Sequence, residues 1–253
     1  MTVARNVSRE TSPQLQQGAE PLDAVRRALE ALGAPFGENE RALWARYVEL
    51  FDRWARRTNL VSLRDRERWI ERHVVPSLAL LRVVPLRAGH TVVDIGTGAG
   101  FPGLPLALVR RDCQFYLIES RRWRVLFLEE VVQCLELSNV QVLGTRVEDQ
   151  GVRELLARRC DRAVARAVAD LATLWEWAGP LLKENGRLVA YKGRAEASRE
   201  MARLVERTGE SIAVEVRPLP WQEKHTVVVI LSRKKDEEAR EEGAAEKNPG
   251  RGL

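Results

Sequence analysis

The segment Val92–Gly103 constrains the fold of this chain more than any other part of the sequence. Its β-branched residues lead to Asp94, glycines then recur at nearly alternate positions, and the apolar segment 104–109 follows. This order predicts a strand, a tight turn and the start of a helix. The glycines permit positive φ, and the helix start offers unpaired N–H groups at a positive dipole end. The segment therefore predicts a site for a nucleotide-like ligand at the carboxyl edge of a parallel sheet.

The spacing of these glycines separates two classes of cofactor. The frame Gly98-x-Gly100-x-x-Gly103 fits the dinucleotide fingerprint, but there the first glycine follows the strand directly, whereas here an acid and another glycine intervene. The longer frame, Asp94-x-Gly96-x-Gly98-x-Gly100, resembles that of class I S-adenosylmethionine (AdoMet) methyltransferases. AdoMet carries a sulfonium and an amino acid, and a carboxylate at the strand end can organise the turn around that cationic end. The pattern favours AdoMet over NAD.

Two further loops supply candidate ligand contacts. The apolar strand expected at 115–118 ends before Glu119, a carboxylate that can accept both ribose hydroxyls. Both cofactors need such an acid, so Glu119 supports the site without choosing the ligand. After the third expected strand, the backbone of Val147 and the side chain of Glu148 can meet an adenine edge. The alternative is an acidic N-cap on the next helix, a role that Asp149 can fill equally well.

Length and composition limit the class of protein. The 253 residues suffice for one α/β domain with extensions, and the longest apolar runs are far too short to span a membrane. The first twenty or so residues lack the apolar region of a secretory signal. The cysteines are odd in number and lack the spacing of metal ligands, which fits a reducing compartment. We expect a cytoplasmic monomer with no membrane partner and no metal.

The chain divides into four expected regions. Residues 1–19 and 233–253 are polar or charged and lack apolar anchors, so both are predicted to be disordered. Residues 20–85 form an expected N-terminal helical cap, and residues 86–232 an expected AdoMet-binding methyltransferase domain. Strand and helix patterns alternate from Thr91 onward, as in a doubly wound parallel sheet. The predicted fold class is α/β, a class I AdoMet-methyltransferase (Rossmann-like) doubly wound sheet with an N-terminal helical cap.

The expected elements follow from hydrophobic periodicity and from helix start and stop residues. In the cap, Pro21 opens a first helix that Gly33 ends, a second covers 43–54, and Asp65 caps a third that Pro76 should end or kink. The aromatic residues of these helices are interpreted as core. The expected strands are 91–95, 115–118, 140–143, 161–165, 187–191, 212–216 and 225–231, with helices near 103–110, 123–136, 151–158, 171–183 and 195–208.

The end of the fourth expected strand carries Arg166. No Asn/Asp-Pro-Pro-aromatic motif for an exocyclic amine is present there, and no cysteine stands ready to attack a pyrimidine carbon. An arginine stays protonated and is a poor general base, but it can bind a phosphate or the O6/N7 edge of guanine. Arg166 is therefore the candidate catalytic residue.

Several segments together point to one family. They are Asn59–Ser62, Arg72–Leu78, the glycine turn through Phe101-Pro102-Gly103, Glu119-Ser120, Arg146–Glu148, Ala165–Ala167 and Lys192-Gly193. From about Asn59 to Ile230 the chain resembles the RsmG (GidB) family of bacterial 16S ribosomal RNA methyltransferases. The Phe-Pro-Gly extension together with Arg166 is much more specific than the glycines alone.

The resemblance implies transfer of the AdoMet methyl group to N7 of a guanine in the decoding-region loop, so 16S RNA or the small ribosomal subunit is the expected partner. It also implies that Gly96, Phe101, Val147, Glu148 and Arg166 line the cofactor and reaction site. The chemistry agrees, because guanine N7 has an in-plane lone pair and no proton to remove. The enzyme must align N7, methyl carbon and sulfur, which is a proximity effect.

Two positions depart from the family pattern. The family usually has Asp where this chain has Pro76, and often Lys where it has Trp123. Pro76 cannot serve an acidic role, and Trp123 weakens the expectation of a phosphate contact at that position.

The basic residues give a further indication of an RNA partner. Lys and Arg exceed Asp and Glu by 41 to 36, which hints at nucleic acid while also fitting a solvated surface. Arginines gather around the motifs, at 56–57, 64–72 and 121–124. The candidates for the RNA-facing rim are His73, Lys192, Lys224 and His225. A packing role is as well supported for His73, and nothing decides between the two roles for the pair 224–225.

Two other functions stay open on the residues alone. One is an AdoMet methyltransferase that acts on a small molecule or protein, over which the helical cap could close. The other is an NAD-binding or regulatory module without transferase activity. Salt-sensitive RNA binding and a comparison of AdoMet with NAD in thermal shift distinguish these functions.

Overall fold

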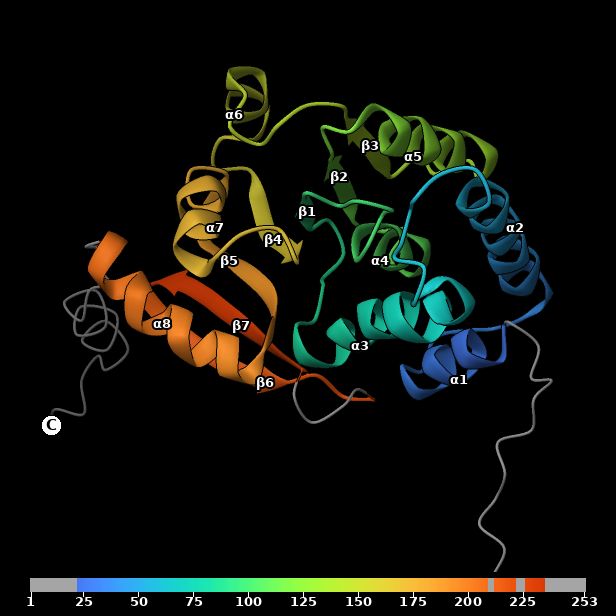
Figure 1. The fold of residues 1–253 in the computed structure, drawn as a ribbon, viewed down its shortest axis with the longest axis horizontal. Coiled ribbons are helices and arrows are strands. Elements are labelled where there is room, and N and C mark those ends of the chain that lie inside the picture. Colours follow the sequence, from blue (N-terminus) through green and yellow to red (C-terminus); the bar gives the residue numbers. More distant parts are fainter. Residues whose placement is uncertain (1–21, 209–211, 222–225, 235–253) are drawn as a thin grey trace, which may run out of the picture.

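A seven-stranded sheet organises the chain, which a computed structural model describes over residues 22–208, 212–221 and 226–234. The strand order is β3-β2-β1-β4-β5-β7-β6, parallel from β3 to β5, with β7 antiparallel to both of its neighbours. This confirms the predicted doubly wound sheet (Figure 1). The strands are β1 (Thr91–Ile95), β2 (Gln114–Ile118), β3 (Val140–Leu143), β4 (Cys160–Arg166), β5 (Leu182–Gly193), β6 (Ile212–Pro218) and β7 (Thr226–Arg233).

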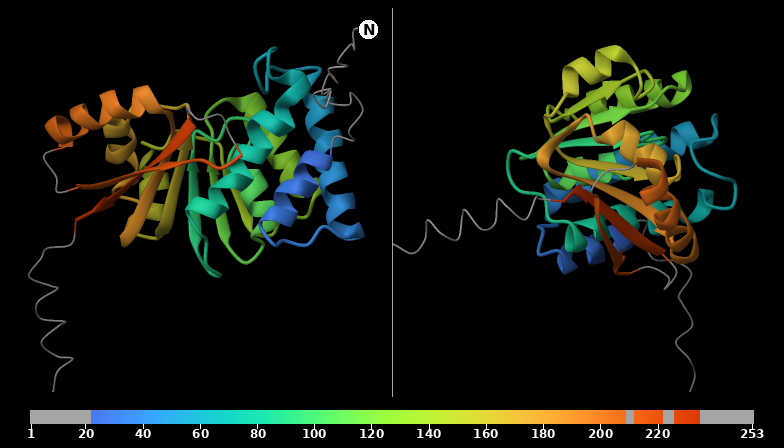
Figure 2. Two further views of the ribbon diagram at one scale, coloured as in Figure 1. Left: turned by 90° about the horizontal axis from the view of Figure 1, so that it is seen from below. Right: turned by 90° about the vertical axis from the view of Figure 1, so that its left-hand side faces the viewer.

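Helices cover both faces of the sheet. The helical elements are α1 (Asp23–Ala31), α2 (Glu38–Ala55), the 3-10 turn η1 (Arg66–Arg68), the π-helix η2 (Ile70–Val74), α3 (Val75–Val83), α4 (Gly103–Val109), α5 (Arg122–Cys134), α6 (Gln150–Leu156), α7 (Leu171–Ala178) and α8 (Arg194–Thr208). The cap helices α1–α3 share one buried cluster with α4 and α5, whereas α6–α8 pack in a second cluster. Figure 2 shows the cap and α8 at opposite ends of the molecule.

The sequence pattern of β1 explains how the two clusters form. Successive side chains of a strand point to opposite faces, so Val92 packs with the cap cluster while Val93 and Ile95 pack with the α6–α8 cluster. Asp94 also lies in this buried strand and is fully buried. A carboxylate at such a position needs hydrogen-bond partners, and the turn that follows β1 supplies them.

Three local expectations needed correction. The helix expected at 171–183 ends at Ala178, because Gly179 and Pro180 follow and β5 begins at Leu182. Pro76 was expected to end or kink its helix; the helical path continues past it, but the π-helix η2 ends at Val74 and α3 begins at Val75, with the proline in the first turn of α3, where it loses no hydrogen bond. Strand β7 runs to Arg233, one residue beyond the boundary drawn for the charged tail.

The remaining expectations about the chain ends fall outside the described residues. This holds for 1–19 and for 235–253. No helix in the described part of the chain is both long and apolar enough to cross a membrane.

Candidate functional site

The glycines of the turn between β1 and α4 are required by backbone conformation, by close packing or by both. Gly96, Gly98 and Gly100 all have positive φ, from +62° to +87°. A Cβ on Gly100 would come within 2.3 Å of Leu104, and one on Gly103 within 2.3 Å of the Leu117 side chain. At Gly98 the nearest atom would be Nη1 of Arg124 at 3.6 Å, an ordinary contact, so glycine is required there by the positive φ and not by close packing.

The carboxylate of Asp94 stabilises this turn through hydrogen bonds. Its Oδ2 accepts hydrogen bonds from the Thr97 hydroxyl at 2.6 Å and from the Gly103 amide at 2.8 Å. Its Oδ1 is buried without a hydrogen-bond partner among the described residues. Burial raises the pKa of Asp94 to about 7, although the two hydrogen bonds oppose that rise. The carboxyl group can therefore gain or lose its charge near neutral pH, and a bound cation would favour the charged form.

Glu119 lies at the end of β2, directly beside the end of β1. The register pairs Ile95 with Ile118, which places the two acid-bearing strand ends side by side. Glu119 is buried to 6% exposure and accepts a hydrogen bond from the Arg121 amide at 2.8 Å. Its other oxygen lies 3.4 Å from Nη1 of Arg124. The carboxylate thus keeps acceptor capacity for a polar ligand.

The loop after β3 resolves one alternative left open by the sequence. Asp149 caps α6, because its Oδ1 accepts the Gly151 amide at 2.9 Å. Val147 is buried against the second cluster, whereas Glu148 is exposed. The capping role therefore falls to Asp149, and the roles of Val147 and Glu148 toward adenine stay predictions.

Arg166 connects the end of β4 to the helical cap. Its Nη2 donates to the backbone oxygen of Arg72 at 2.7 Å, and its guanidinium lies 5.8 Å from the ring centre of Tyr191. The Tyr191 hydroxyl in turn donates to the backbone oxygen of Pro76. Nη1 of Arg166 is buried and has no partner among the described residues. The contacts with Arg72 and Tyr191 thus hold the guanidinium in place, and its Nη1 stays available as a hydrogen-bond donor.

His73 packs against the glycine turn. Its ring stacks on that of Phe101, with centroids 5.1 Å apart and planes inclined by 19°. Burial and the nearby charge of Arg166 lower the pKa of His73 to about 4, so the ring is neutral at physiological pH. Its Nε2 is buried without a hydrogen bond and lies 3.5 Å from a carboxylate oxygen of Asp65. The structure thus gives His73 a packing contact, and its contact with RNA stays a prediction.

Three buried polar atoms without partners come from adjacent parts of the fold. They are Oδ1 of Asp94, Nη1 of Arg166 and Nε2 of His73. Strands β1 and β4 are paired in the sheet, and the charge of Arg166 acts on His73. Buried polar atoms normally have hydrogen-bond partners, so a set of unpartnered ones indicates a place for a polar ligand.

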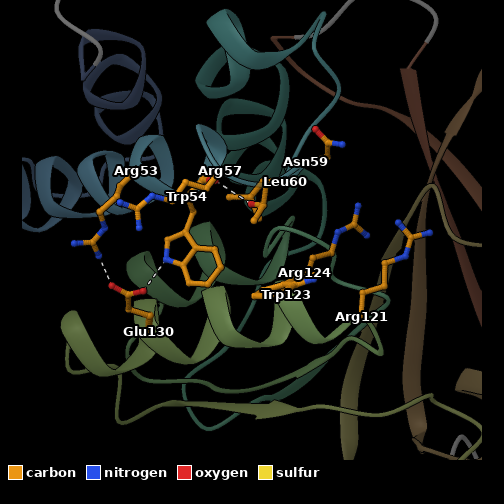
Figure 3. A pocket seen from close by; sticks show the side chains of 10 residues that line it. Arg53, Trp54, Arg57, Asn59, Leu60, Arg121, Trp123, Arg124 and Glu130 are labelled. Atoms are coloured by element: carbon orange, nitrogen blue, oxygen red, sulfur yellow. Dashed lines mark hydrogen bonds and ion pairs between the residues drawn. The ribbon is translucent and has the colours of Figure 1, made fainter.

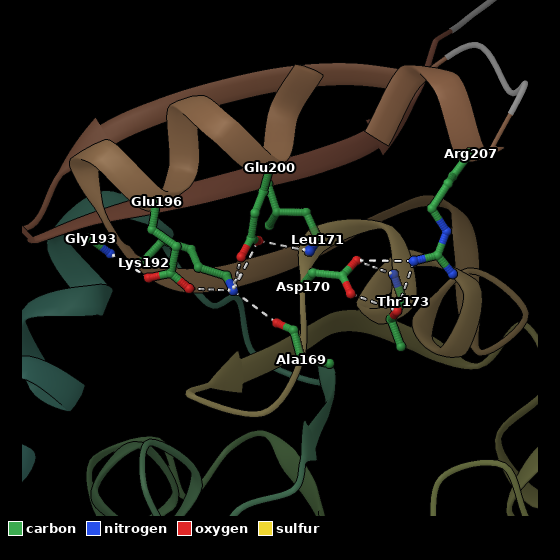
Figure 4. A network of polar contacts seen from close by, with 9 residues as sticks. All are labelled: Ala169, Asp170, Leu171, Thr173, Lys192, Gly193, Glu196, Glu200 and Arg207. Carbon is green, nitrogen blue, oxygen red and sulfur yellow. Dashed lines mark hydrogen bonds and ion pairs between the residues drawn. The ribbon is translucent and has the colours of Figure 1, made fainter. Parts of the chain in front are cut away.

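Lys192 lies inside a polar network (Figure 4). Its ammonium donates to the backbone oxygen of Ala169 at 2.8 Å and forms ion pairs at 3.0 Å with Glu196 and Glu200. Glu200 also accepts the Leu171 amide at 2.9 Å. The network therefore holds the loop after β4 against α8, and all three ammonium protons are used.

Of the residues predicted to face RNA, the structure describes only His73 and Lys192. Lys192 is buried at 7% exposure, so its contact with RNA stays a prediction that the structure does not favour. Lys224 and His225 lie outside the described residues.

A pocket of about 1050 Å³ opens beside Glu119, and sequence reasoning did not single it out (Figure 3). It lies between the end of α2, the loop that follows and the start of α5. The signals in the sequence were the clustering of arginines around the motifs, the segment Asn59–Ser62 and the departure from the family pattern at Trp123. The lining residues are Arg53, Trp54, Arg57, Thr58, Asn59, Leu60, Arg121, Trp123, Arg124 and Glu130.

The fold and the site define a class of protein. The structure is similar to a crystal structure of a SAM-dependent methyltransferase from Aquifex aeolicus, with a TM-score of 0.51 and 22% identity over 64% of this chain and 90% of that one. This confirms the class I methyltransferase fold. The methyl donor of this class is AdoMet.

Sequence comparison defines the family. The model of the family described as rRNA small subunit methyltransferase G (GidB) matches residues 40–219. A protein named ribosomal RNA small subunit methyltransferase G from Mycobacterium marinum is 39% identical over 86% of this chain and 91% of its own length. One of the same name from Chloroflexus aggregans is 38% identical over 79% and 85%. The chain belongs to this family of methyltransferases.

The residues present fit AdoMet. A cationic ligand suits the unpartnered Oδ1 of Asp94, and a ribose suits the acceptor capacity of Glu119. His73 is neutral and so adds no positive charge beside a sulfonium.

Proposed function

We propose that this protein transfers a methyl group from AdoMet to N7 of a guanine in the 16S RNA of the small ribosomal subunit. Its family supports the RNA substrate. The observation that carries the choice of base is Arg166, with a buried, unpartnered Nη1 at the end of β4, beside the glycine turn. A guanidinium matches the acceptor edge of guanine. Because N7 must be free to attack, Arg166 donates only to O6, the other acceptor on that edge.

The reaction makes modest demands on the protein. Bound AdoMet supplies a methyl group that its sulfonium activates. Guanine N7 carries no proton, so no residue has to act as a general base. What the chain must provide is alignment of the base, which can account for a large part of a rate enhancement. Arg166 is suited to this task because Arg72 and Tyr191 hold its guanidinium from one side.

The other site residues bind and orient in this proposal. Glu119 accepts hydrogen bonds from the ribose hydroxyls, and Asp94 holds the turn and balances the cationic end of the cofactor. Val147 and Glu148 bind the adenine edge. Phe101, held by His73, closes the cap side of the turn.

The setting of the reaction is also part of the proposal. We place the protein in the cytoplasm, where ribosomal subunits are assembled, and we propose that one chain forms the complete site. Light scattering on purified protein tests this proposal, and a dimer at micromolar concentration would contradict it.

The direct test is methylation of purified small subunits. Subunits from a strain that lacks the gene are incubated with methyl-labelled AdoMet, and nuclease digests are then analysed by mass spectrometry. We expect N7-methylguanosine to form with the wild-type protein and to fall sharply with Arg166→Ala. Arg203→Ala is the matched control, because Arg203 is exposed on α8, at the opposite end of the molecule from the cap. Label in a protein or a metabolite instead of RNA would overturn the proposal.

A further inference from the structure

The pocket beside Glu119 has one side built from side chains that contact one another and another side that is exposed to solvent. On the first side, the indole nitrogen of Trp54 donates to Glu130 at 2.6 Å, and Arg53 pairs with the same carboxylate. The ring of Trp54 also packs edge-on against Phe127, with centroids 6.0 Å apart. These contacts connect α2 to α5 on one side of the pocket (Figure 3).

The charge of the pocket is strongly positive. Four of its lining residues are arginines, and its single acid, Glu130, is already paired with Arg53. The side chains of Arg57 and Arg121 are exposed and form no ion pair with the residues that the structure describes. Arginine binds phosphate oxygens through two donors at once. The pocket therefore suits an anionic ligand that carries phosphates.

The solvent-exposed side of the pocket carries a tryptophan, Trp123. Trp123 lies in the first turn of α5, and 66% of its surface is exposed to solvent. Large aromatic side chains are usually buried in a soluble protein, so one exposed at the edge of an arginine-lined pocket indicates a ligand contact. Exposed aromatics between arginines are the arrangement with which proteins bind single-stranded nucleic acid, because bases stack on the rings while phosphates pair with the cations.

We propose that this pocket binds an unpaired nucleotide of the RNA substrate, with its base stacked on Trp123 and its phosphates held by Arg57 and Arg121. The inference rests on the proposed function and names the surface through which that function reaches RNA outside the target base. It also gives Trp123 a role of its own. The family often has a lysine at this position, which can pair with a phosphate. The tryptophan ring of this chain can stack on an unpaired base instead.

Arg124 joins the pocket to the cofactor site. It lines the pocket, lies 3.4 Å from Glu119 and is the nearest side chain to the position of a Cβ on Gly98. The nucleotide pocket is thus directly adjacent to the acid that we assign to the ribose. RNA held in this pocket lies within one side chain of the bound cofactor.

Binding of a fluorescein-labelled single-stranded oligoadenylate, followed by anisotropy, tests the stacking contact. Loss of a base–aromatic stack costs about 1–3 kcal/mol, so Trp123→Ala should weaken binding by about 5- to 150-fold, and Trp123→Phe should recover most of the affinity. The exposed position tolerates alanine, a better helix former than tryptophan. Wild-type affinity in Trp123→Ala, or no measurable binding by the wild-type protein, would overturn the proposal.

Salt dependence tests the phosphate contacts separately. Each phosphate contact to a single strand contributes about 0.7 to the slope of log K against log salt concentration. Arg57→Ala and Arg121→Ala should each reduce that slope by about this amount, whereas the control Arg203→Ala should leave it unchanged. Equal slopes in all four proteins would contradict the assigned contacts.

Methylation kinetics separate this proposal from the one on which it rests. With small subunits as substrate, Trp123→Ala should raise KM and leave kcat and the calorimetric affinity for AdoMet near their wild-type values. If the wild-type protein methylates subunits but Trp123→Ala matches it in KM, only the nucleotide pocket is refuted. If the wild-type protein does not methylate subunits at all, the proposed function fails, whatever the pocket binds.

Discussion

The ring of His73 lies stacked on the ring of Phe101, with 5.1 Å between centroids, and so joins the helical cap to the cofactor turn. The two residues come from η2 and from the turn before α4, and burial keeps the histidine neutral by lowering its pKa to about 4. The cap therefore packs against the glycine turn as well as forming part of the core.

This contact predicts a pH dependence of stability. A histidine with a pKa near 6.5 when unfolded and about 4 when folded binds more protons in the unfolded state between those values. Its contribution is complete above pH 6.5 and is lost as the pH falls toward 4, with a total on the order of 3 kcal/mol. His73→Phe keeps the stacking and removes the titration. Urea unfolding at pH 5 and pH 7.5 should show a smaller loss in the variant, and equal losses would contradict the pKa.

Asp94 predicts a pH dependence of cofactor binding, which also increases with pH but around a higher midpoint. Its pKa of about 7 in the free protein means that raising the pH through 7 generates the carboxylate that a cationic ligand favours. AdoMet affinity should therefore rise between pH 6 and pH 8. Asp94→Asn keeps an oxygen that can accept from Thr97 and Gly103. Calorimetry on this variant should show weaker binding with a flatter pH profile, and an unchanged profile would exclude Asp94 as the source.

The glycines of the turn should respond differently to substitution. Gly98→Val strains a positive φ by about 1–2 kcal/mol, but its Cβ would make only an ordinary contact, 3.6 Å from Nη1 of Arg124, so the protein should fold and lose AdoMet binding. Gly100→Val places its Cβ 2.3 Å from Leu104 and should disrupt the turn itself. Thermal unfolding with and without AdoMet distinguishes the two. Unchanged AdoMet affinity in Gly98→Val would refute the location of the site.

Lys192 should contribute to stability more than to RNA binding. Lys192→Met leaves Glu200 without its cation in a largely buried position and should cost about 2–3 kcal/mol. The double variant Lys192→Met/Glu200→Gln should recover part of that loss, as measured by urea unfolding. The KM for small subunits should stay near the wild-type value at a temperature where both variants are folded. A raised KM in a stable variant would restore the predicted contact with RNA.

The sequence predicted the sheet and the cofactor turn because both depend on local patterns. Alternating strand and helix patterns fixed the order of elements, and the glycine spacing after Asp94 identified the turn. What failed locally was the end of α7, where Gly179-Pro180 outweighed the helical pattern, and the effect of Pro76, whose position in the first turn of α3 is harmless.

The parts of the site that sequence reasoning missed depend on distant segments. The pocket combines the end of α2 with the start of α5, and no local pattern shows that these helices meet. The burial of Lys192 depends on α8 folding back over the loop after β4. A lysine after a strand suggests a ligand contact, and only the position of Glu200 shows that its charge is already used.

The central claim is methylation of one guanine at N7, and chemical cleavage of cellular RNA tests it most directly. N7-methylguanosine carries a positive ring charge, so borohydride followed by aniline cuts the chain there. Small-subunit RNA should be cut at one guanine in wild-type cells and should stay uncut there in a deletion strain. Plasmid-borne wild-type protein and Arg203→Ala should restore the cut, Arg166→Ala should not, and Arg166→Lys should restore it poorly because lysine lacks the planar fork. A cleavage pattern that deletion leaves unchanged would contradict the account.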